Sequence, residues 1–152
     1  MKKIIILIVL LSALAMSGCG TVIDTIMTGM MPAPKDYSYE VGTGYQLVRS
    51  SVHSISVSSI ENGNKAHIDA KVVEVAWDDR YVLAKQVGLK LQQPDNPNNT
   101  YKIPDENQVA YYILDTIDDV LYGGYSFEEF NREREALGVP DALMLKDVES
   151  YK

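Results

Sequence analysis

The sequence predicts an α+β fold: a mostly antiparallel β-sheet, built as a meander of hairpins and followed by a C-terminal helix. Two observations support this prediction. From Tyr37 onward, polar and apolar residues alternate in short runs separated by Gly, Asn and Asp turns, which is typical of half-buried strands. After Tyr125 the apolar spacing becomes that of a helix with clear start and stop signals.

The first residues form a lipoprotein signal. Lys2 and Lys3 precede an apolar run over residues 4–11, which is too short for a membrane span of about 20 residues. Residues 16–19, MSGC, then have the form of a lipobox. We expect cleavage between Gly18 and Cys19, and a diacylglyceryl group on the Cys19 thiol. An ordinary signal peptide, cut after Ala13-Leu14-Ala15, and an uncleaved anchor are the alternatives.

Lipid on Cys19 has a direct physical consequence. Each buried methylene contributes about 0.8 kcal/mol, so two or three acyl chains hold a small domain on a membrane. We therefore expect the protein to be lipid-anchored to a bacterial membrane, outside the cytoplasm, at the cell surface or in the periplasm.

Three segments are expected: a signal peptide over residues 1–18, a lipid anchor and tether over 19–36, and a single globular domain over 37–152. Pro32 and Pro34 would stop any helix begun earlier in the tether. The alternative for the tether is a short amphipathic turn lying on the membrane.

The charge of the chain excludes some partners. It has 14 basic and 21 acidic side chains and a net charge of −7, and loss of Lys2 and Lys3 makes the exported part more acidic. Such a surface disfavours nucleic acid and anionic lipid headgroups as partners. Cys19 is the only cysteine, so no disulfide is expected.

The strands are expected in hairpin order. Residues 68–77 form a long strand, with Val73, Val75 and Trp77 on one face, and return over 81–85 after a turn at 78–80. The other strands are expected at 37–41, 45–49, 53–58, 109–114 and 120–122, with turns at 42–44, 61–64 and 115–119 and a polar loop at 92–99.

The helix is expected to begin after Ser126. Ser126 and Glu129 form a capping box, and Phe127, Phe130 and Leu137 follow at helical spacing. Gly138 and Pro140 end the helix, and residues 142–145 are expected to form a short second turn packed on the sheet.

An ordered series of short motifs resembles one family. The series is Gly44-Tyr45-Gln46-Leu47-Val48-Arg49, residues 75–85 (VAWDDRYVLAK), 96–101 (NPNNTY), 112–115 (YILD), 122–125 (YGGY), Glu129-Phe130, Arg134-Glu135 and 137–140 (LGVP). It is similar to that of small lipoproteins carrying an uncharacterised domain, best known from Gram-positive bacteria. The resemblance covers nearly the whole mature chain and implies anchoring and a single domain. It implies no activity and no functional residues.

Candidate catalytic or metal-binding groups are few. His53 and His67 are the only histidines, and a role in metal binding or proton transfer needs carboxylates close to them. Asp78-Asp79 and Asp118-Asp119 stand at turns, where Asp side chains ordinarily bond the nearby backbone. Asp95, Asn99 and Glu106 match a calcium loop at positions one, five and twelve, but Pro97 and Thr100 break the pattern. We expect no metal and no cofactor.

Tyrosine is unusually common, with ten residues against two phenylalanines. A tyrosine ring is a flat apolar surface with a polar tip, which suits contacts with carbohydrate or protein. Tyr111, Tyr112 and Tyr125 are the candidates for a binding face; the alternative is an ordinary sheet with a wet outer face.

The sequence supports two functional hypotheses. The first is a membrane-anchored binding or structural module, not an enzyme, that contacts an envelope protein or wall polymer. The second is a small envelope hydrolase using Asp and His groups, which requires His53 or His67 within hydrogen-bond reach of a carboxylate.

Overall fold

The computed structural model describes residues 36–61 and 66–151. They belong to one compact unit, Asp36–Lys152. The signal peptide, Gly18, Cys19, the tether up to residue 35 and the Asn62-Gly63 turn lie outside the described residues. Within these two ranges, no helix has the length and apolar character needed to cross a membrane.

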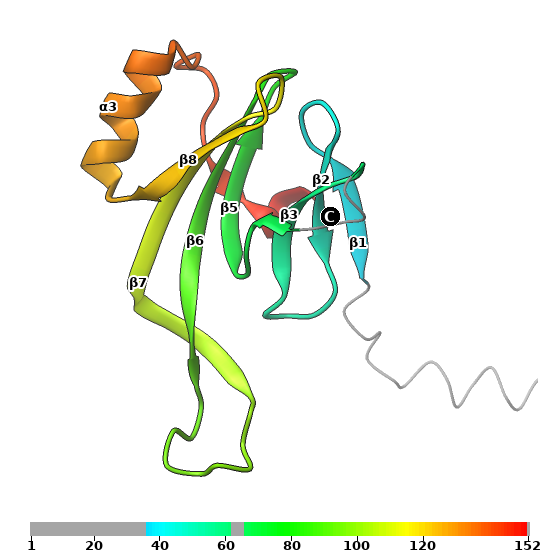
Figure 1. Ribbon diagram of the computed structural model, residues 1–152, viewed down its shortest axis with the longest axis vertical. Helices are drawn as coiled ribbons and strands as arrows, with labels where there is room; N and C mark the ends of the chain where they lie inside the picture. Colours follow the sequence, from blue (N-terminus) through cyan, green and yellow to red (C-terminus); the bar gives the residue numbers. More distant parts are fainter. Residues whose placement is uncertain (1–35, 62–65, 152) are drawn as a thin grey trace, which may run out of the picture. The chain divides into compact units, whose positions relative to one another are not determined.

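Two antiparallel sheets form the described domain (Figure 1). In the first, the strands are ordered β1-β2-β3-β4; in the second, β8-β7-β6-β5-β9. Strands of the first sheet are β1 (Tyr37–Glu40), β2 (Tyr45–Arg49), β3 (Ile55–Ser59) and β4 (Ala66–Ile68). Strands of the second are β5 (Val72–Trp77), β6 (Tyr81–Leu91), β7 (Lys102–Asp115), β8 (Val120–Tyr125) and β9 (Lys146–Asp147). The predicted α+β class, mostly antiparallel with a C-terminal helix, is confirmed.

The second sheet is buried on both faces. Along β6, Val82 and Ala84 pack into a core shared with the first sheet, whereas Tyr81 and Leu83 pack into a second core under the helix. Figure 1 shows the helix and the first sheet on opposite sides of β5–β8. Successive side chains of a strand point to opposite faces of the sheet. A strand in the middle of three layers is buried on both faces and therefore needs an unbroken run of apolar residues.

The predicted long strand over residues 68–77 is wrong as a single element. Ile68 pairs with Val57 in the first sheet, whereas Val72 begins a strand of the second sheet. The chain crosses between the sheets at residues 69–71, and Ile68 and Val72 on either side of the crossing both enter the shared core. The hairpin of this segment with β6 is confirmed, since Trp77 pairs with Val82.

The predicted face of β5 also needs correction. A bulge between Val72 and Glu74 inserts an extra residue, so Val72 shares the buried face with Val75, both fully buried. Val73 lies half-buried instead.

The helix, α3 (Phe127–Leu137), forms where the sequence predicts it. The Ser126 hydroxyl accepts from the Glu129 backbone N–H, and the Glu129 carboxylate reaches back to the Ser126 N–H. Gly138 closes the helix at φ 69°, in the left-handed region. Phe130 is 1% exposed and anchors α3 on the second sheet.

The segment after α3 differs from the prediction. The expected short turn at residues 142–145 lies slightly earlier, where the Leu143 N–H donates to the Pro140 carbonyl at 3.0 Å, and Leu143 and Leu145 pack on the second core as predicted. The chain continues into β9, which pairs with β5, and ends in a 3-10 helix, η1 (Val148–Tyr151). The pairing of β9 with the edge of β5 gives hydrogen-bond partners to backbone N–H and C=O groups that a short turn would leave exposed.

Candidate functional site

The β6–β7 hairpin is longer than the sequence predicts. β7 begins at Lys102 and not at Val109, because the strand contains a large bulge. Val87 pairs with Val109, but the next residue, Gly88, pairs with Asp105, so residues 106–108 stand outside the ladder. Figure 1 shows β7 turning sharply at this point. A bulge bends its strand and so changes the direction of the chain on either side of it.

Asp105 holds this bulge in place. Its Oδ1 accepts from Lys90 Nζ at 3.1 Å and from the Asn107 backbone N–H and side-chain amide, both at 3.3 Å. The hydrogen bond from Lys90 holds the pKa of Asp105 below its ordinary value. Gly88 is also required here, because a Cβ at this position would lie 2.7 Å from the Gln108 Cβ. The outer half of the hairpin is therefore fixed by charge and by close packing.

The outer half of the hairpin faces the loop between β2 and β3. Its Tyr101 ring lies edge-on to the ring of His53 in that loop, with centroids 5.8 Å apart and an interplanar angle of 68°. Between these segments is an open cavity of about 610 Å³, which we call the hairpin cavity. Its lining consists of Ser51, Val52, His53, Asn98, Asn99, Thr100, Tyr101 and Lys102.

The hairpin cavity presents polar groups that the described part of the chain leaves without a partner. Tyr101 is 54% exposed. Within residues 36–61 and 66–151, no hydrogen bond or ion pair involves the Tyr101 hydroxyl, the Lys102 ammonium or the Asn98 side-chain amide. The backbone that carries them is nevertheless ordered, because Asn99 Oδ1 accepts from the Tyr101 N–H at 2.9 Å. These groups are positioned and available to a ligand.

The residues that partly match a calcium loop do not converge. Asp95 and Asn99 lie near the hairpin tip, Glu106 stands in the bulge, and Asn99 already accepts from the backbone. In the two described ranges, no group of three His, Cys, Asp or Glu side chains is placed to hold a metal ion.

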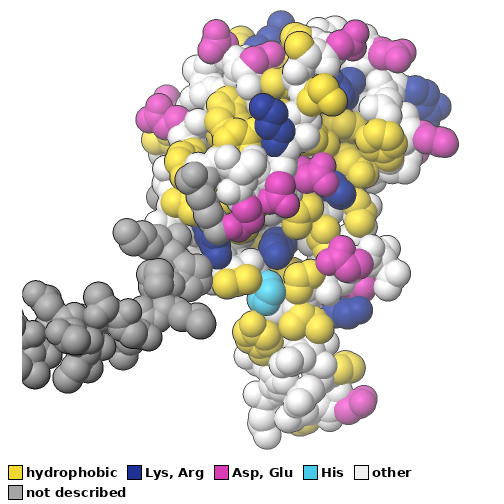
Figure 2. All heavy atoms as spheres, turned by 180° about the vertical axis from the view of Figure 1, so that it is seen from behind, with side chains coloured by type: hydrophobic (Ala, Val, Ile, Leu, Met, Phe, Trp, Pro, Cys, Tyr) yellow, Lys and Arg dark blue, Asp and Glu magenta, His cyan; other side chains and the backbone are white. Residues whose placement is uncertain are grey.

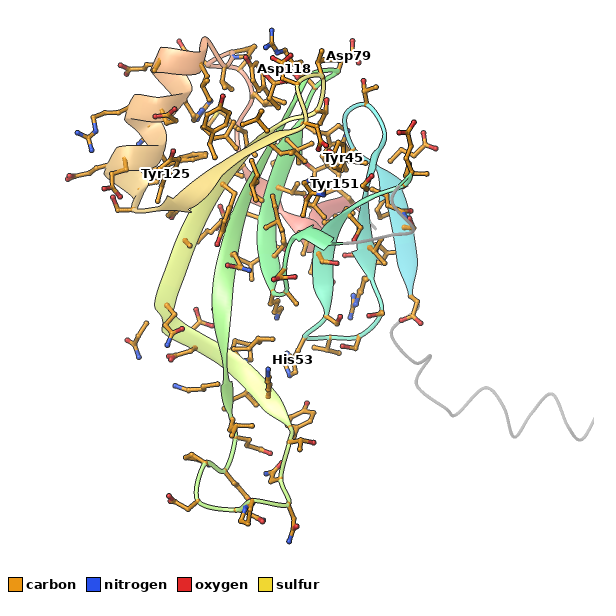
Figure 3. The ribbon with its side chains drawn as sticks, viewed as in Figure 1. Tyr45, His53, Asp79, Asp118, Tyr125 and Tyr151 are labelled. Carbon is orange, nitrogen blue, oxygen red and sulfur yellow. The ribbon has the colours of Figure 1, made fainter. Side chains whose placement is uncertain are left out.

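The two Asp-rich turns lie at the same end of the second sheet, as Figure 3 shows for Asp79 and Asp118. Asp78 Oδ1 accepts from the backbone N–H groups of Arg80 and Tyr81, at 2.9 and 2.7 Å. Asp78 therefore has the predicted turn role.

Arg80 links the two turns. It donates through Nε and one terminal nitrogen to Asp115 Oδ2, at 2.9 and 2.7 Å, and to Asp118 Oδ2 at 2.9 Å. Burial raises the pKa of Asp115, but Arg80 and two backbone N–H groups outweigh it and hold that pKa below its ordinary value. Asp115 and Asp118 thus have a structural role, since both bind Arg80 and so connect the two turns at this end of the sheet.

Asp119 joins the two sheets. His67 Nε2 on β4 lies 3.0 Å from Asp119 Oδ1, and the Tyr45 hydroxyl on β2 donates to the same oxygen. The hydrogen bond from Tyr45 lowers the pKa of Asp119, while burial and this carboxylate raise the pKa of Tyr45. No sequence pattern indicates this cluster, because its members come from three distant segments.

A smaller cavity of about 250 Å³ lies beside this cluster. Its lining includes Thr43, Tyr45, Thr116 and Asp119. The other imidazole nitrogen, His67 Nδ1, is buried and has no hydrogen-bond partner in the described part of the chain. His67 thus lies within hydrogen-bond reach of a carboxylate, as the hydrolase hypothesis requires. However, Nδ1, the nitrogen that would accept a proton from a substrate, is buried.

The three predicted binding tyrosines lie half-buried and pack against core residues. The Tyr111 ring lies 5.4 Å from that of Phe127 and 5.2 Å from that of Phe130. Tyr112 covers Gly123 and donates to Gln86 Oε1 at 3.1 Å. Tyr125 packs on the core under α3. Their binding role stays a prediction, and the more exposed aromatic surface at Tyr101 was not predicted.

No curated protein and no solved structure matches the chain. A family model described as "Protein of unknown function (DUF3997)" matches residues 42–149, from the β1–β2 turn to η1. This confirms the predicted resemblance to an uncharacterised domain. The chain belongs to the DUF3997 family of proteins of unknown function.

Proposed function

We propose that this protein is a lipid-anchored binding module of the bacterial cell envelope and that the hairpin cavity is its binding site. Acyl chains on Cys19 hold it on a membrane outside the cytoplasm, as is typical of small lipoproteins. The lipobox at residues 16–19 supports the anchor.

The observation that carries the binding role is the geometry of the β6–β7 hairpin. A bulge fixed by Asp105 brings Tyr101 to His53 and forms a cavity between two segments far apart in the sequence. Ligand sites combine apolar rings with a few convergent polar groups in a cavity of roughly 300–1,000 Å³. The hairpin cavity has this size, and it combines the rings of Tyr101 and His53 with several polar side chains.

The alternative binding site for such a module is a surface formed by Tyr111, Tyr112 and Tyr125. It has less support, because much of each ring packs against core residues. A partner bound there would contact the second sheet near α3, which an experiment distinguishes from the hairpin cavity.

A small envelope hydrolase using Asp and His groups is the second candidate function. The contact of His67 Nε2 with Asp119 favours it. A substrate would enter the adjoining cavity and meet Asp119 and the hydroxyl groups of Thr43 and Thr116. The burial of His67 Nδ1 makes this candidate the weaker one.

In-cell photocrosslinking tests the binding role. Three variants each carry one photoreactive amino acid. It replaces Asn98 in the hairpin cavity, Tyr125 on the alternative tyrosine surface, or Glu128 on the exposed surface of α3 as the control. We expect a defined adduct from position 98, none from 128, and loss of the adduct in a Cys19→Ala background. Adducts from 125 or 128 but not from 98 would contradict the proposal.

A further inference from the structure

We infer that the hairpin cavity takes a glycan that carries an acidic group, with a sugar ring on Tyr101 and the acid on Lys102. This inference rests on the proposed function and names the ligand class of the same site. Three features of the cavity lead to it: an exposed ring, uncharged hydrogen-bonding side chains and one cation.

The exposed ring is the first feature. Tyr101 is 54% exposed although its ring meets that of His53 in a T-shaped contact, so more than half of its surface is open to a ligand. A pyranose has an apolar C–H face and a polar rim, and it buries the apolar face well against a flat aromatic ring whose edge remains wet. An extended apolar ligand would need a deeper and drier site than this one.

The uncharged polar lining is the second feature. Ser51, Asn98, Asn99 and Thr100 all face the cavity. A side-chain amide both donates and accepts, as a hydroxyl does, and so do the hydroxyl and acetamido groups of amino sugars. Figure 2 shows the projecting hairpin with mostly uncharged polar and hydrophobic surface, in contrast to the charged body of the domain. This favours a ligand rich in hydroxyl groups over a charged peptide.

The cation is the third feature. Lys102 is the one lysine or arginine in the cavity lining, in a chain whose net charge is −7. It makes no ion pair within the described ranges. A single cation in an acidic protein selects ligands with isolated acidic groups and rejects dense polyanions, because the overall field repels them. One acidic group per sugar unit fits this arrangement.

Calorimetric titration of the lipidated chain in detergent tests the inference. The probes are the disaccharide of N-acetylglucosamine and N-acetylmuramic acid, which has a carboxylate, and the neutral dimer of N-acetylglucosamine. N-acetylglucosamine 1-phosphate against N-acetylglucosamine tests phosphate as the acidic group. We expect an acidic probe to bind about fivefold more tightly than its neutral counterpart, or about 1 kcal/mol.

Two variants assign the effect to the cavity. Lys102→Gln should remove the preference for the acidic probe and leave binding of the neutral one unchanged. Tyr101→Ala should weaken both by tenfold or more. Lys146→Gln on β9 is the matched control and should change neither. Both cavity side chains are exposed, so the variants should keep the wild-type circular dichroism spectrum.

The outcomes separate the inference from the proposed function. Equal affinity for acidic and neutral probes, or a preference that survives Lys102→Gln, would overturn the inference. If no sugar binds although a photoreactive group at position 98 still captures a partner, the glycan is wrong and the binding module stands. If position 98 captures nothing either, both fail.

Discussion

Tyr101 on the outer half of the β6–β7 hairpin lies edge-on to His53 in the β2–β3 loop, with ring centroids 5.8 Å apart. This contact ties the projecting end of the second sheet to the first sheet. It exists because the bulge at residues 106–108 bends β7 before the hairpin reaches its tip. The hairpin cavity therefore depends on residues that do not line it.

Asp105→Asn should loosen the hairpin without unfolding the domain. An amide at this position loses the charge that Lys90 pairs with, whereas the cores on both faces of the second sheet remain intact. We expect amide hydrogens of residues 89–91 and 102–105 to exchange about tenfold faster, with those of β5 unchanged, by mass spectrometry. Asp95→Asn at the hairpin tip is the control. Unchanged exchange in Asp105→Asn would show that the carboxylate does not hold the bulge.

The two phenylalanines of α3 should differ greatly in their contribution to stability. Phe130 is 1% exposed and Phe127 is 58% exposed. Phe130→Ala should lower the free energy of unfolding by about 3–5 kcal/mol, because it leaves a cavity under the helix. Phe127→Ala should cost less than about 1 kcal/mol. Urea denaturation followed by circular dichroism measures both, and similar losses would contradict the packing of α3.

Asp119 should contribute to the acid sensitivity of the fold. The Tyr45 hydrogen bond lowers its pKa in the folded state, so its stabilisation is full above the unfolded pKa of about 3.9 and is lost as the pH falls through the folded value. Asp119→Asn, which cannot titrate, should show a shallower decline of unfolding free energy below about pH 5. Denaturant curves from pH 6 to 2 measure this slope, with Asp95→Asn for comparison. A slope like that of the wild type would show that Asp119 does not contribute to the acid sensitivity.

Cys19→Ala should release the protein from the membrane. The thiol is the only group in the chain that can receive the diacylglyceryl unit, and the substitution removes it. We expect loss of labelling by radioactive fatty acid and a shift away from the membrane fraction. Ser17→Ala keeps a small residue before the cleaved bond and should remain lipidated. Continued fatty-acid labelling of Cys19→Ala would disprove the predicted anchor.

Local signals explain the elements that the sequence predicts well. Ser126, Glu129 and Gly138 specify where α3 begins and ends through hydrogen bonds within a few residues. The hairpin of β5 with β6 is equally local, since Asp78 accepts from backbone N–H groups two and three residues later. Such features need no knowledge of the rest of the fold.

The features that could not be predicted from the sequence depend on contacts between residues far apart in the chain. Residues 104–108, PDENQ, have the composition of a loop, and only pairing with β6 makes Pro104 and Asp105 part of a strand. The assignment of Ile68 to one sheet and Val72 to the other depends on which strands lie beside them.

The candidate site depends on distant partners in the same way. His53 and Tyr101 approach each other through the bend in β7, and His67 meets Asp119 across the two sheets. The spacing of apolar residues predicts single helices and strands, and it does not predict which distant segments come together.

The binding role of the hairpin cavity is tested most directly by an NMR titration of the ¹⁵N-labelled lipidated chain in detergent with soluble fragments of purified cell wall. If the hairpin cavity is the binding site, shift changes should concentrate at the amides of residues 51–53 and 98–102, and Tyr101→Ala should abolish them. Changes centred on the second sheet near α3, or on the Tyr45–Asp119 cluster, would contradict this role. A spectrum that does not change would contradict the glycan as the ligand.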